Sequence, residues 1–384
     1  MIKEYLIDNL IKNKDFPDWM IEGRNAALNK LVSLRHNTKY GLGMYPFFSP
    51  PDLGHLEKDI DLPITISAPD NVHIVSLTEA LCIPYYQNIL KEYYHLPFVP
   101  EKLPSTAYFL KAFIPSGYII HVPKGFHDDS PITIDIQANK NLQLGYLLIL
   151  ADEDCQVSFI EKNQNTNPST YLAALATNII AQDNAKVEYT RLHKSVAPHF
   201  VLQSTTIGNN AEVTFLDANQ GSTLAQADIR TTLVGEKSRV KHMHMIRLEK
   251  EQKYDVFSAI HHQGSHSHSE MLSKTILNDS SHAIYRGLTN INQDAMDAVA
   301  SQKEDTLLLG EKAKIDTVPM LEIQNDLVQA HHSTAITHIN AEQLFYLQSR
   351  GLSTPESKEI IMQGFLAPVW ERISCKAARA ILLS

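Results

Sequence analysis

Near the N-terminus, apolar residues recur at the spacing of an α-helix. The residues that form this stripe are Met20, Ala27, Leu31 and Leu34. The stripe predicts a helix over residues 17–36. The proline- and glycine-rich stretch Gly41–Leu53 is expected to end that helix, and an apolar segment near 78–94 is also typical of a helix. We therefore expect an N-terminal helical region over residues 1–104.

From about residue 105 the period of the pattern changes to two. Short segments such as GYIIHV, ITIDIQ, GYLLIL and EVTFLDA are rich in β-branched and aromatic residues and are separated by turn residues. Because no helix-length stripe interrupts these segments up to about residue 335, we expect a continuous β region over residues 105–339.

One turn pattern recurs within this region. A short apolar run precedes a polar turn, a small residue, any residue and then a β-branched one, as in IAQDNAKV (180–187). The small residues, spaced by 30, 26, 27, 43 and 32 positions, are Cys155, Ala185, Ala211, Ser238, Ser281 and Ala313. A unit of this length predicts stacked rungs in which the small residue permits close approach and the β-branched residue faces a narrow core. A β-sandwich is the competing fold, but its turns usually recur about every 8–12 residues.

Helical signals return near residue 340. Asn340 begins a capping-box pattern, and Gly351 is expected to end the helix that follows. The run Ser-Thr-Pro at 353–355 predicts a second helix that ends at Gly364, with a third helix after it. These signals indicate a C-terminal helical region over residues 340–384.

Composition and charge exclude several classes of protein and of partner. Of 384 residues, 43% are hydrophobic and 20% charged, which is typical of a soluble globular protein. The net charge of −9 argues against a nucleic-acid partner, because phosphate binding needs clustered positive charge. The three cysteines show no CxxC spacing, which argues against a local cysteine-ligated metal site and fits a cytoplasmic protein. No run of about 18 apolar residues occurs, so no membrane span is expected.

Histidines are the most conspicuous candidates for chemistry. His242 and His244 alternate, as do His266, His268 and Glu270. Alternate residues of a strand share a face, so three such groups could hold one divalent metal ion. The two histidine pairs are 24 residues apart, close to one repeat, and could stack on adjacent rungs. One interpretation is thus a metal-dependent enzyme; the alternative is that these are polar, solvent-facing strand positions.

The C-terminal half carries a more specific pattern. Gln302, the run LLLGEKAKIDTVPMLEIQNDLVQAHH (307–332), the run LFYLQSRG (344–351) and the pair Gly364-Phe365 follow one another in order, and GYIIHVPKGF (117–126) precedes them. Over about 255–365 this pattern resembles the SufB/SufD family of iron–sulfur cluster assembly scaffolds, and its SufD members more than its SufB members.

The resemblance implies a mainly β fold, a right-handed parallel β-helix core between α-helical N- and C-terminal regions. It also implies a non-catalytic subunit of a cytoplasmic SufBCD-type complex. In such a complex the subunit pairs with SufB through the β-helices and binds SufC, the ABC-type ATPase, through the C-terminal helices. No intrinsic cofactor is implied; iron or an iron–sulfur cluster would be held transiently at the interface with SufB.

Carried onto this sequence, the resemblance assigns two sites. The interface histidine of the family falls on His332, a candidate ligand for iron or a cluster. The SufC-binding surface falls on Leu344, Phe345, Tyr346, Arg350 and Gly351. Ala330 stands where the family often has cysteine, so this position supplies no thiolate, which favours the SufD role over the SufB role. A third interpretation is a β-helix interaction protein that forms a homodimer when alone.

Overall fold

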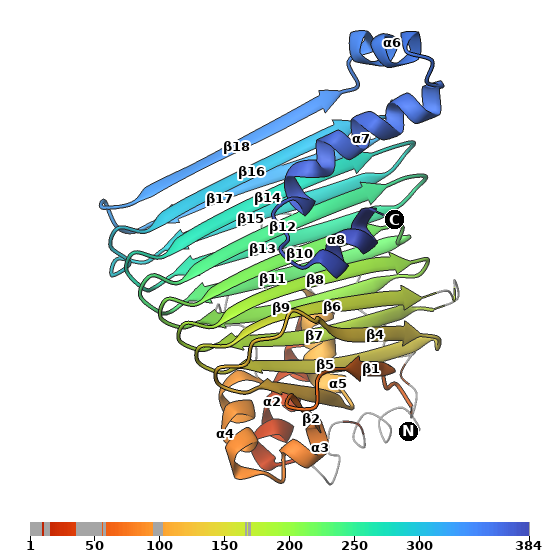
Figure 1. Cartoon of the computed structure of the whole chain (residues 1–384). Helices are drawn as coiled ribbons and strands as arrows, with labels where there is room; N and C mark the ends of the chain where they lie inside the picture. The colour runs from red at the N-terminus through yellow and green to blue at the C-terminus, as the bar shows by residue number, and fades with distance from the viewer. Residues whose placement is uncertain are drawn as a thin grey trace.

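The computed structural model describes residues 16–35, 59–94, 103–165 and 170–383, together with Leu10, Leu56 and Asn167. In this part of the chain the strands form two nine-stranded sheets (Figure 1). Sheet A, from the C-terminal end, contains β17 (Lys314–Ile323), β15 (His282–Ile291), β13 (Lys253–His262), β11 (Leu224–Leu233), β9 (His199–Ile207), β7 (Leu172–Ala181), β5 (Leu142–Ala151), β3 (Gly117–Val122) and β2 (His73–Ser76). Sheet B, from the N-terminal end, contains β1 (Ile64–Ser67), β4 (Ile132–Ala138), β6 (Gln156–Asn165), β8 (Lys186–Ser195), β10 (Glu212–Gln220), β12 (Arg239–Leu248), β14 (His268–Leu277), β16 (Val299–Leu308) and β18 (Gln329–His338).

The two sheets form a parallel β-helix of about eight turns. Consecutive strands from β3 to β18 alternate between the sheets, and each pairs in parallel with the strand two further along the chain, as β12 pairs with β14. The antiparallel pairs β1–β4 and β2–β3 stand at the N-terminal end of the stack. The predicted stacked-rung fold is therefore confirmed, and the competing sandwich built from hairpins is wrong.

The rungs pass from sheet A to sheet B through a tight turn with one residue in the left-handed region. With φ between 54 and 60°, these residues are Asp154, Asn184, Asn210, Lys237, His266 and Asp297. Asparagine and aspartate tolerate this conformation better than most side chains. Each of these residues donates its amide to a carbonyl of the next rung, as Asn184 does to Asn209 at 2.8 Å. The turns therefore form a hydrogen-bonded ladder along this edge.

The predicted series of small residues is wrong in one respect. Four of them directly follow the tight turn: Cys155, Ala185, Ala211 and Ser238. Ser281 and Ala313 lie at the opposite edge, where the chain returns from sheet B to sheet A. The true series continues through Ser267 and Ala298, both fully buried, and this explains the outlying spacing of 43 residues.

The core between the sheets contains the β-branched residues that the repeat predicted. The valines two residues after each small residue, Val157, Val187, Val213 and Val240, are all buried there. At the N-terminal end, α2 (Asp18–Arg35), α3 (Leu77–Ala80), α4 (Pro84–Tyr93) and α5 (Ser105–Phe113) surround the first rungs (Figure 1). The helices expected at 17–36 and 78–94 are present, the second as two pieces, whereas the loop expected at 41–53 lies outside the described residues.

The parallel strands begin later than the periodicity predicts, although two short antiparallel strands, β1 and β2, lie within the region expected to be helical. Residues 105–113 form α5 rather than a strand, because Phe109, Leu110 and Phe113 lie at helical spacing and are fully buried in a second apolar cluster with α2. The parallel rungs therefore begin at Gly117, the first residue of β3.

At the C-terminal end, α6 (Ala341–Ser349), α7 (Thr354–Trp370) and α8 (Lys376–Leu383) follow the last strand. The caps at Asn340 and Ser353 and the left-handed Gly351 lie where the sequence predicts them. The predicted end at Gly364 is wrong: α7 continues through Gly364 because Met362 and Leu366 on either side are buried against sheet B. None of the described helices is long and apolar enough to cross a lipid bilayer.

Candidate functional site

A column of polar side chains runs through the β-helix core along sheet B. Each strand of sheet B from β6 to β18 contributes one residue, in direct register with the residue of the next strand in the sheet. The residues of this polar column are Glu161, Arg191, Asp217, His244, Ser273, Glu304 and Thr334. All but Thr334 are buried. Burying a charge without a partner is costly, so the partners of these groups decide what the column can do.

The first two members neutralise each other. The Arg191 guanidinium donates through Nε to Glu161 Oε1 at 2.9 Å and through a terminal nitrogen to Gln203 at 2.8 Å. The Tyr189 hydroxyl donates to the other oxygen of Glu161. Burial, and then the negative charge of Glu161, raise the pKa of Tyr189 well above its ordinary value. This end of the column is a fully buried ion pair in which one terminal nitrogen of Arg191 has no hydrogen-bond partner.

Asp217 is the centre of the next group. Tyr254 donates its hydroxyl to Asp217, and imidazole nitrogens of His193 and His244 lie 3.7 and 3.9 Å from its carboxylate oxygens. Burial alone would raise the pKa of Asp217, but the interaction with His244 and nearby positive charge bring it below its ordinary value. Burial lowers the pKa of His193 well below its ordinary value. The group therefore holds one buried carboxylate, with the imidazole of His193 kept neutral by burial.

Glu304 is the least satisfied member of the column. Neither of its carboxyl oxygens has a hydrogen-bond partner, and the hydroxyl of Tyr285 is also without one. Burial raises the pKa of Glu304 from 4.5 to about 8, so the neutral acid predominates at pH 7. Glu304 is in register with Thr334 of the last strand. The neutral carboxyl group of Glu304 therefore lies one strand before the exposed end of the core.

The last rung is open. Residues of β18 are almost all exposed, and Ile336 and Ile323 expose 52% and 44% of their surface although they continue the core-facing columns. His332 lies in this rung, in register with the buried Gln302 of β16. Its column continues through Met271 and His242. The predicted ligand His332 is thus an exposed, core-facing residue at the open end, and His331 belongs to the opposite face.

The predicted metal site of five residues does not form. His242 hydrogen-bonds to Thr231 Oγ1 and Ser258 Oγ, both at 2.8 Å, so both ring nitrogens are used inside the core. His268 is in register with Arg239 rather than with His242 or His244. The expected stacking of the two histidine pairs on adjacent rungs is therefore wrong.

The other two predicted ligands also lie apart. His266 occupies the left-handed turn position, 3.6 Å from Asp297, and Glu270 faces Arg372 of the α7–α8 connection at 3.2 Å. The described residues contain no group of three or more histidine, cysteine or acidic side chains able to hold a metal ion. The alternative of solvent-facing strand positions is also wrong for His242 and His244, which are fully buried.

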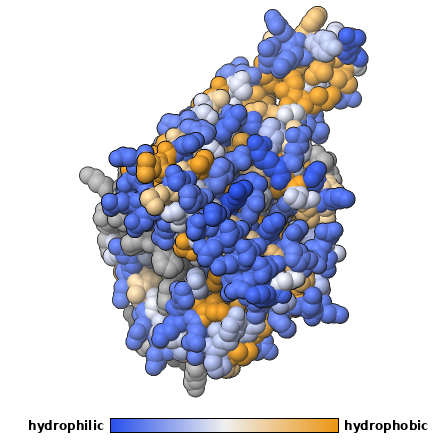
Figure 2. Space-filling view, turned by 60° about the vertical axis from the view of Figure 1, so that its left-hand side comes forward, coloured by the Kyte–Doolittle hydropathy of each residue, from blue (hydrophilic) through white to orange (hydrophobic). Residues whose placement is uncertain are grey.

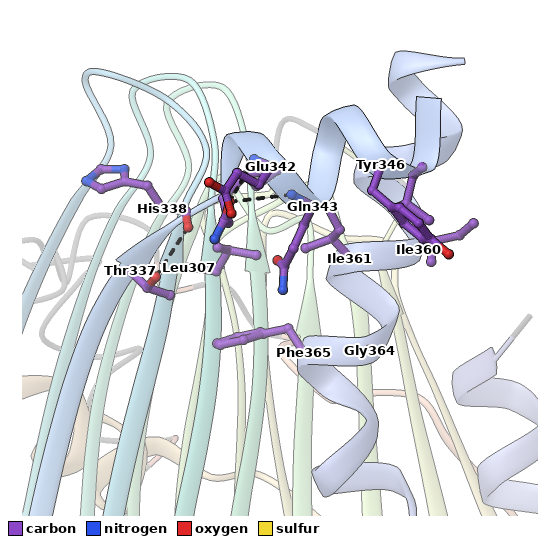
Figure 3. A pocket seen from close by; sticks show the side chains of 13 residues that line it. Leu307, Thr337, His338, Glu342, Gln343, Tyr346, Ile360, Ile361, Gly364 and Phe365 are labelled. Atoms are coloured by element: carbon purple, nitrogen blue, oxygen red, sulfur yellow. Dashed lines mark hydrogen bonds between the residues drawn. The ribbon is translucent and has the colours of Figure 1, made fainter. Parts of the chain in front are cut away.

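A groove of about 820 Å³ lies between the last strands and the C-terminal helices (Figure 3). Its walls include Leu307 of β16, Tyr346 of α6, and Ile360 and Phe365 of α7. Helix α6 has no buried residue, and it projects from the body of the molecule (Figure 1). Apolar side chains gather at this projection, above a mostly hydrophilic face (Figure 2).

The five residues predicted to bind SufC all belong to α6 or its end. Phe345 and Tyr346 expose 71% and 56% of their surface, and Arg350 lies over the Tyr346 ring at 5.1 Å. Leu344 is half-buried, and Gly351 has φ of +93°. Of the five, Tyr346 also lines the groove.

The polar column was missed by the sequence analysis, although a signal for it exists. Each buried member lies six residues after the small residue of the turn, as Arg191 follows Ala185 and Asp217 follows Ala211. Aligning the repeats on the correct small residues, including Ser267 and Ala298, would have shown a polar residue at this place in every rung.

These features define a class: a parallel β-helix with a polar core column, an open terminal rung and a C-terminal helical module. The family model "SUF system FeS cluster assembly, SufBD core domain" matches residues 134–365, which is more than half of the chain. The chain belongs to this SufBD family of iron–sulfur cluster assembly proteins.

Curated relatives agree. Iron–sulfur cluster assembly SufBD family proteins of Staphylococcus saprophyticus and Staphylococcus epidermidis are each 30% identical over 267 residues, which cover 68% of this chain and 57% of theirs. The corresponding protein of Staphylococcus haemolyticus is 28% identical over 297 residues, 76% of this chain and 64% of its own. The chain thus matches less than two thirds of the length of these relatives.

Proposed function

We propose that the chain is a SufD-like, non-catalytic subunit of a cytoplasmic SufBCD-type complex. It would pair with SufB through the open rung and bind the SufC ATPase through α6 and the adjoining groove. Iron or a nascent cluster would be held transiently where the open rung meets SufB, with His332 as a candidate ligand. Membership of the SufBD family and the two exposed surfaces support this proposal.

The open rung is the observation that carries the SufB part of the proposal. In the interior of the stack both edges of each strand are hydrogen-bonded, whereas β17 and β18 each end a sheet. Two adjacent unpaired edges, with core-facing Ile323 and Ile336 exposed between them, form a template for two strands of a partner. A partner of the same fold would continue both sheets and cover the apolar core.

The SufC part depends on α6. An exposed helix with Phe345 and Tyr346 on its surface, followed by a groove lined by apolar side chains, is typical of a surface that docks another protein. Because α6 directly follows β18 in the chain, this surface is joined to the open rung with no other element between them. Movement of the helices by SufC would therefore act directly on the strand that carries His332.

The residues present favour SufD over SufB. Of the three cysteines, Cys155 and Cys375 are buried and Cys82 lies in the α3–α4 connection, far along the chain from the open rung. At the open rung the ligand candidates are imidazoles. A thiolate donor for a cluster would therefore have to come from the partner.

Co-purification of tagged chain with SufB and SufC tests the proposal with two opposite variants. Ile336→Glu places a charge on the open rung and should abolish SufB capture while SufC capture persists. Phe345→Glu on α6 should abolish SufC capture while SufB capture persists. Wild-type chain that captures neither protein, or that is recovered as a homodimer through the open rung, would contradict the proposal and favour the homodimeric interaction protein.

A further inference from the structure

A second cleft, of about 330 Å³, lies between the outer face of sheet B and helices α7 and α8. It is lined by residues at the carboxyl ends of four neighbouring strands of sheet B, β6, β8, β10 and β12, and by residues of α7 and α8. Both helices lie against this sheet (Figure 1). The helices are held in place independently of the cleft. Val369 and Ile373 are fully buried against the sheet, and the Glu188 carboxylate accepts the amides of Ser374 and Cys375 at 2.7 and 2.8 Å.

The floor of the cleft carries an excess of positive charge. Lys162, Lys194 and Arg247 line it, and Glu359 of α7 is the one acidic residue among its lining residues. The Glu359 carboxylate accepts two hydrogen bonds from the Arg247 guanidinium, at 3.1 and 3.3 Å, in a bidentate ion pair. Lys162 lies 3.9 Å from Asp135 and is only weakly paired. Within the described residues, the side chain of Lys194 makes no ion pair and no hydrogen bond.

Neutral polar and apolar groups complete the cleft. The side chains of Gln164 and Gln220 stand at the same strand ends, Gln164 in register with Lys194 and Gln220 with Arg247. Across from the sheet, Trp370 and Leu366 of α7 form an apolar wall. Cations and amides therefore face an indole across a cavity at the small end of the range for ligand sites.

We propose that this cleft binds a nucleoside monophosphate. Two lysines without a strong partner suit a phosphate, and Trp370 offers a face for a planar base. Gln164 and Gln220 can donate to or accept from the base edge or the ribose, since each amide carries both functions. A free phosphate would use only the lysines and leave the Trp370 wall uncovered. The proposal goes beyond the scaffold function and does not depend on SufB or SufC.

Fluorescence of Trp370 provides a direct test on the full chain. The chain has two tryptophans, so a Trp19→Phe background leaves Trp370 as the single indole. Titration with AMP should give saturable quenching, whereas adenosine and inorganic phosphate should bind about tenfold more weakly or worse, because each lacks one half of the contacts. Lys194→Glu should raise the Kd for AMP about tenfold or more.

Lys186→Glu is the matched control. Lys186 lies at the opposite end of β8, about 26 Å from Lys194, and does not line the cleft. It should leave AMP binding unchanged. The proposal is overturned if AMP does not saturate, if Lys186→Glu weakens binding as much as Lys194→Glu does, or if inorganic phosphate binds as tightly as AMP.

Discussion

His332 on β18 lies directly beside Gln302 on β16, in one core-facing column, yet Gln302 is buried and His332 is exposed. Gln302 donates to Thr289 Oγ1 at 2.9 Å across the core. The contrast arises because β18 ends sheet B in the part of the chain that the structure describes, so its outer edge has no neighbouring strand there. His332 is therefore positioned by the fold without being needed for it.

Replacement of His332 by alanine should separate folding from function. The free energy of unfolding should change by less than about 0.5 kcal/mol, because the side chain is exposed. Under the proposed function, activity of iron–sulfur enzymes should fall by about tenfold in cells that depend on this chain, as expected for a lost metal ligand.

His331→Ala is the control for this experiment. His331 is the neighbouring residue on the opposite face of β18, so its loss should leave cluster maturation unchanged. Equal maturation by wild type and His332→Ala would show that the imidazole at 332 has no role in assembly.

Close packing of turns gives a sharp stability prediction. A Cβ on Gly235 would overlap the backbone of Gly208 in the previous rung, and one on Gly264 would overlap Gly235. Gly235→Ala should lower the free energy of unfolding by about 1–3 kcal/mol, as overpacking against a fixed backbone does. Denaturant unfolding measures the change.

Gly364→Ala is the opposite case in the same chain. Gly364 lies within α7, and nothing stands within 4 Å of the Cβ it would gain. It should stabilise the protein by about 0.5–1 kcal/mol, the usual advantage of alanine within a helix. Loss of stability in both variants would mean that glycine is needed for a reason other than the stacking of turns.

The buried histidines were the main error of the sequence analysis, and the reason is physical. Alternation of His242 and His244 correctly indicates one shared face of a strand, but the pattern does not say which face is the core. The hydrogen-bond partners of His242, Thr231 and Ser258, belong to the other sheet, and the sequence pattern does not show that they lie opposite this histidine. The repeat of turns, by contrast, is local, which is why the stacked fold could be predicted.

The site at His332 could be predicted only in part. The adjacent histidines at 331 and 332 are visible in the sequence, and the alternation of a strand places them on opposite faces. The helical signals near residue 340 also indicate that this strand is the last before the C-terminal helices. What the pattern does not show is that its core-facing side chains are exposed, and the role of His332 as an interface residue is implied only by the resemblance to the SufB/SufD family.

His242→Ala tests the structural role assigned to the buried imidazole. The change removes two hydrogen bonds and leaves the hydroxyls of Thr231 and Ser258 buried next to a cavity. The free energy of unfolding should fall by about 2–4 kcal/mol. His266→Asn should be nearly neutral, because asparagine tolerates the left-handed turn position. If a metal ion stabilises the wild type but neither variant, the idea of a shared metal site would be restored.

Glu304 predicts a specific dependence of stability on pH. Its pKa is raised by burial from 4.5 to about 8, so the folded state holds a proton that the unfolded state releases. The stabilisation is fully present below pH 4.5 and is lost as the pH rises to about 8, where the folded state must ionise a buried carboxylate. Glu304→Gln keeps the shape of the neutral acid and removes this ionisation. Denaturant unfolding at pH 5, 6, 7 and 8 should therefore show wild type losing stability relative to Glu304→Gln as the pH rises, by a few kcal/mol in total. A difference that stays constant across this range would show that Glu304 is ionised in the folded protein and has partners in the core.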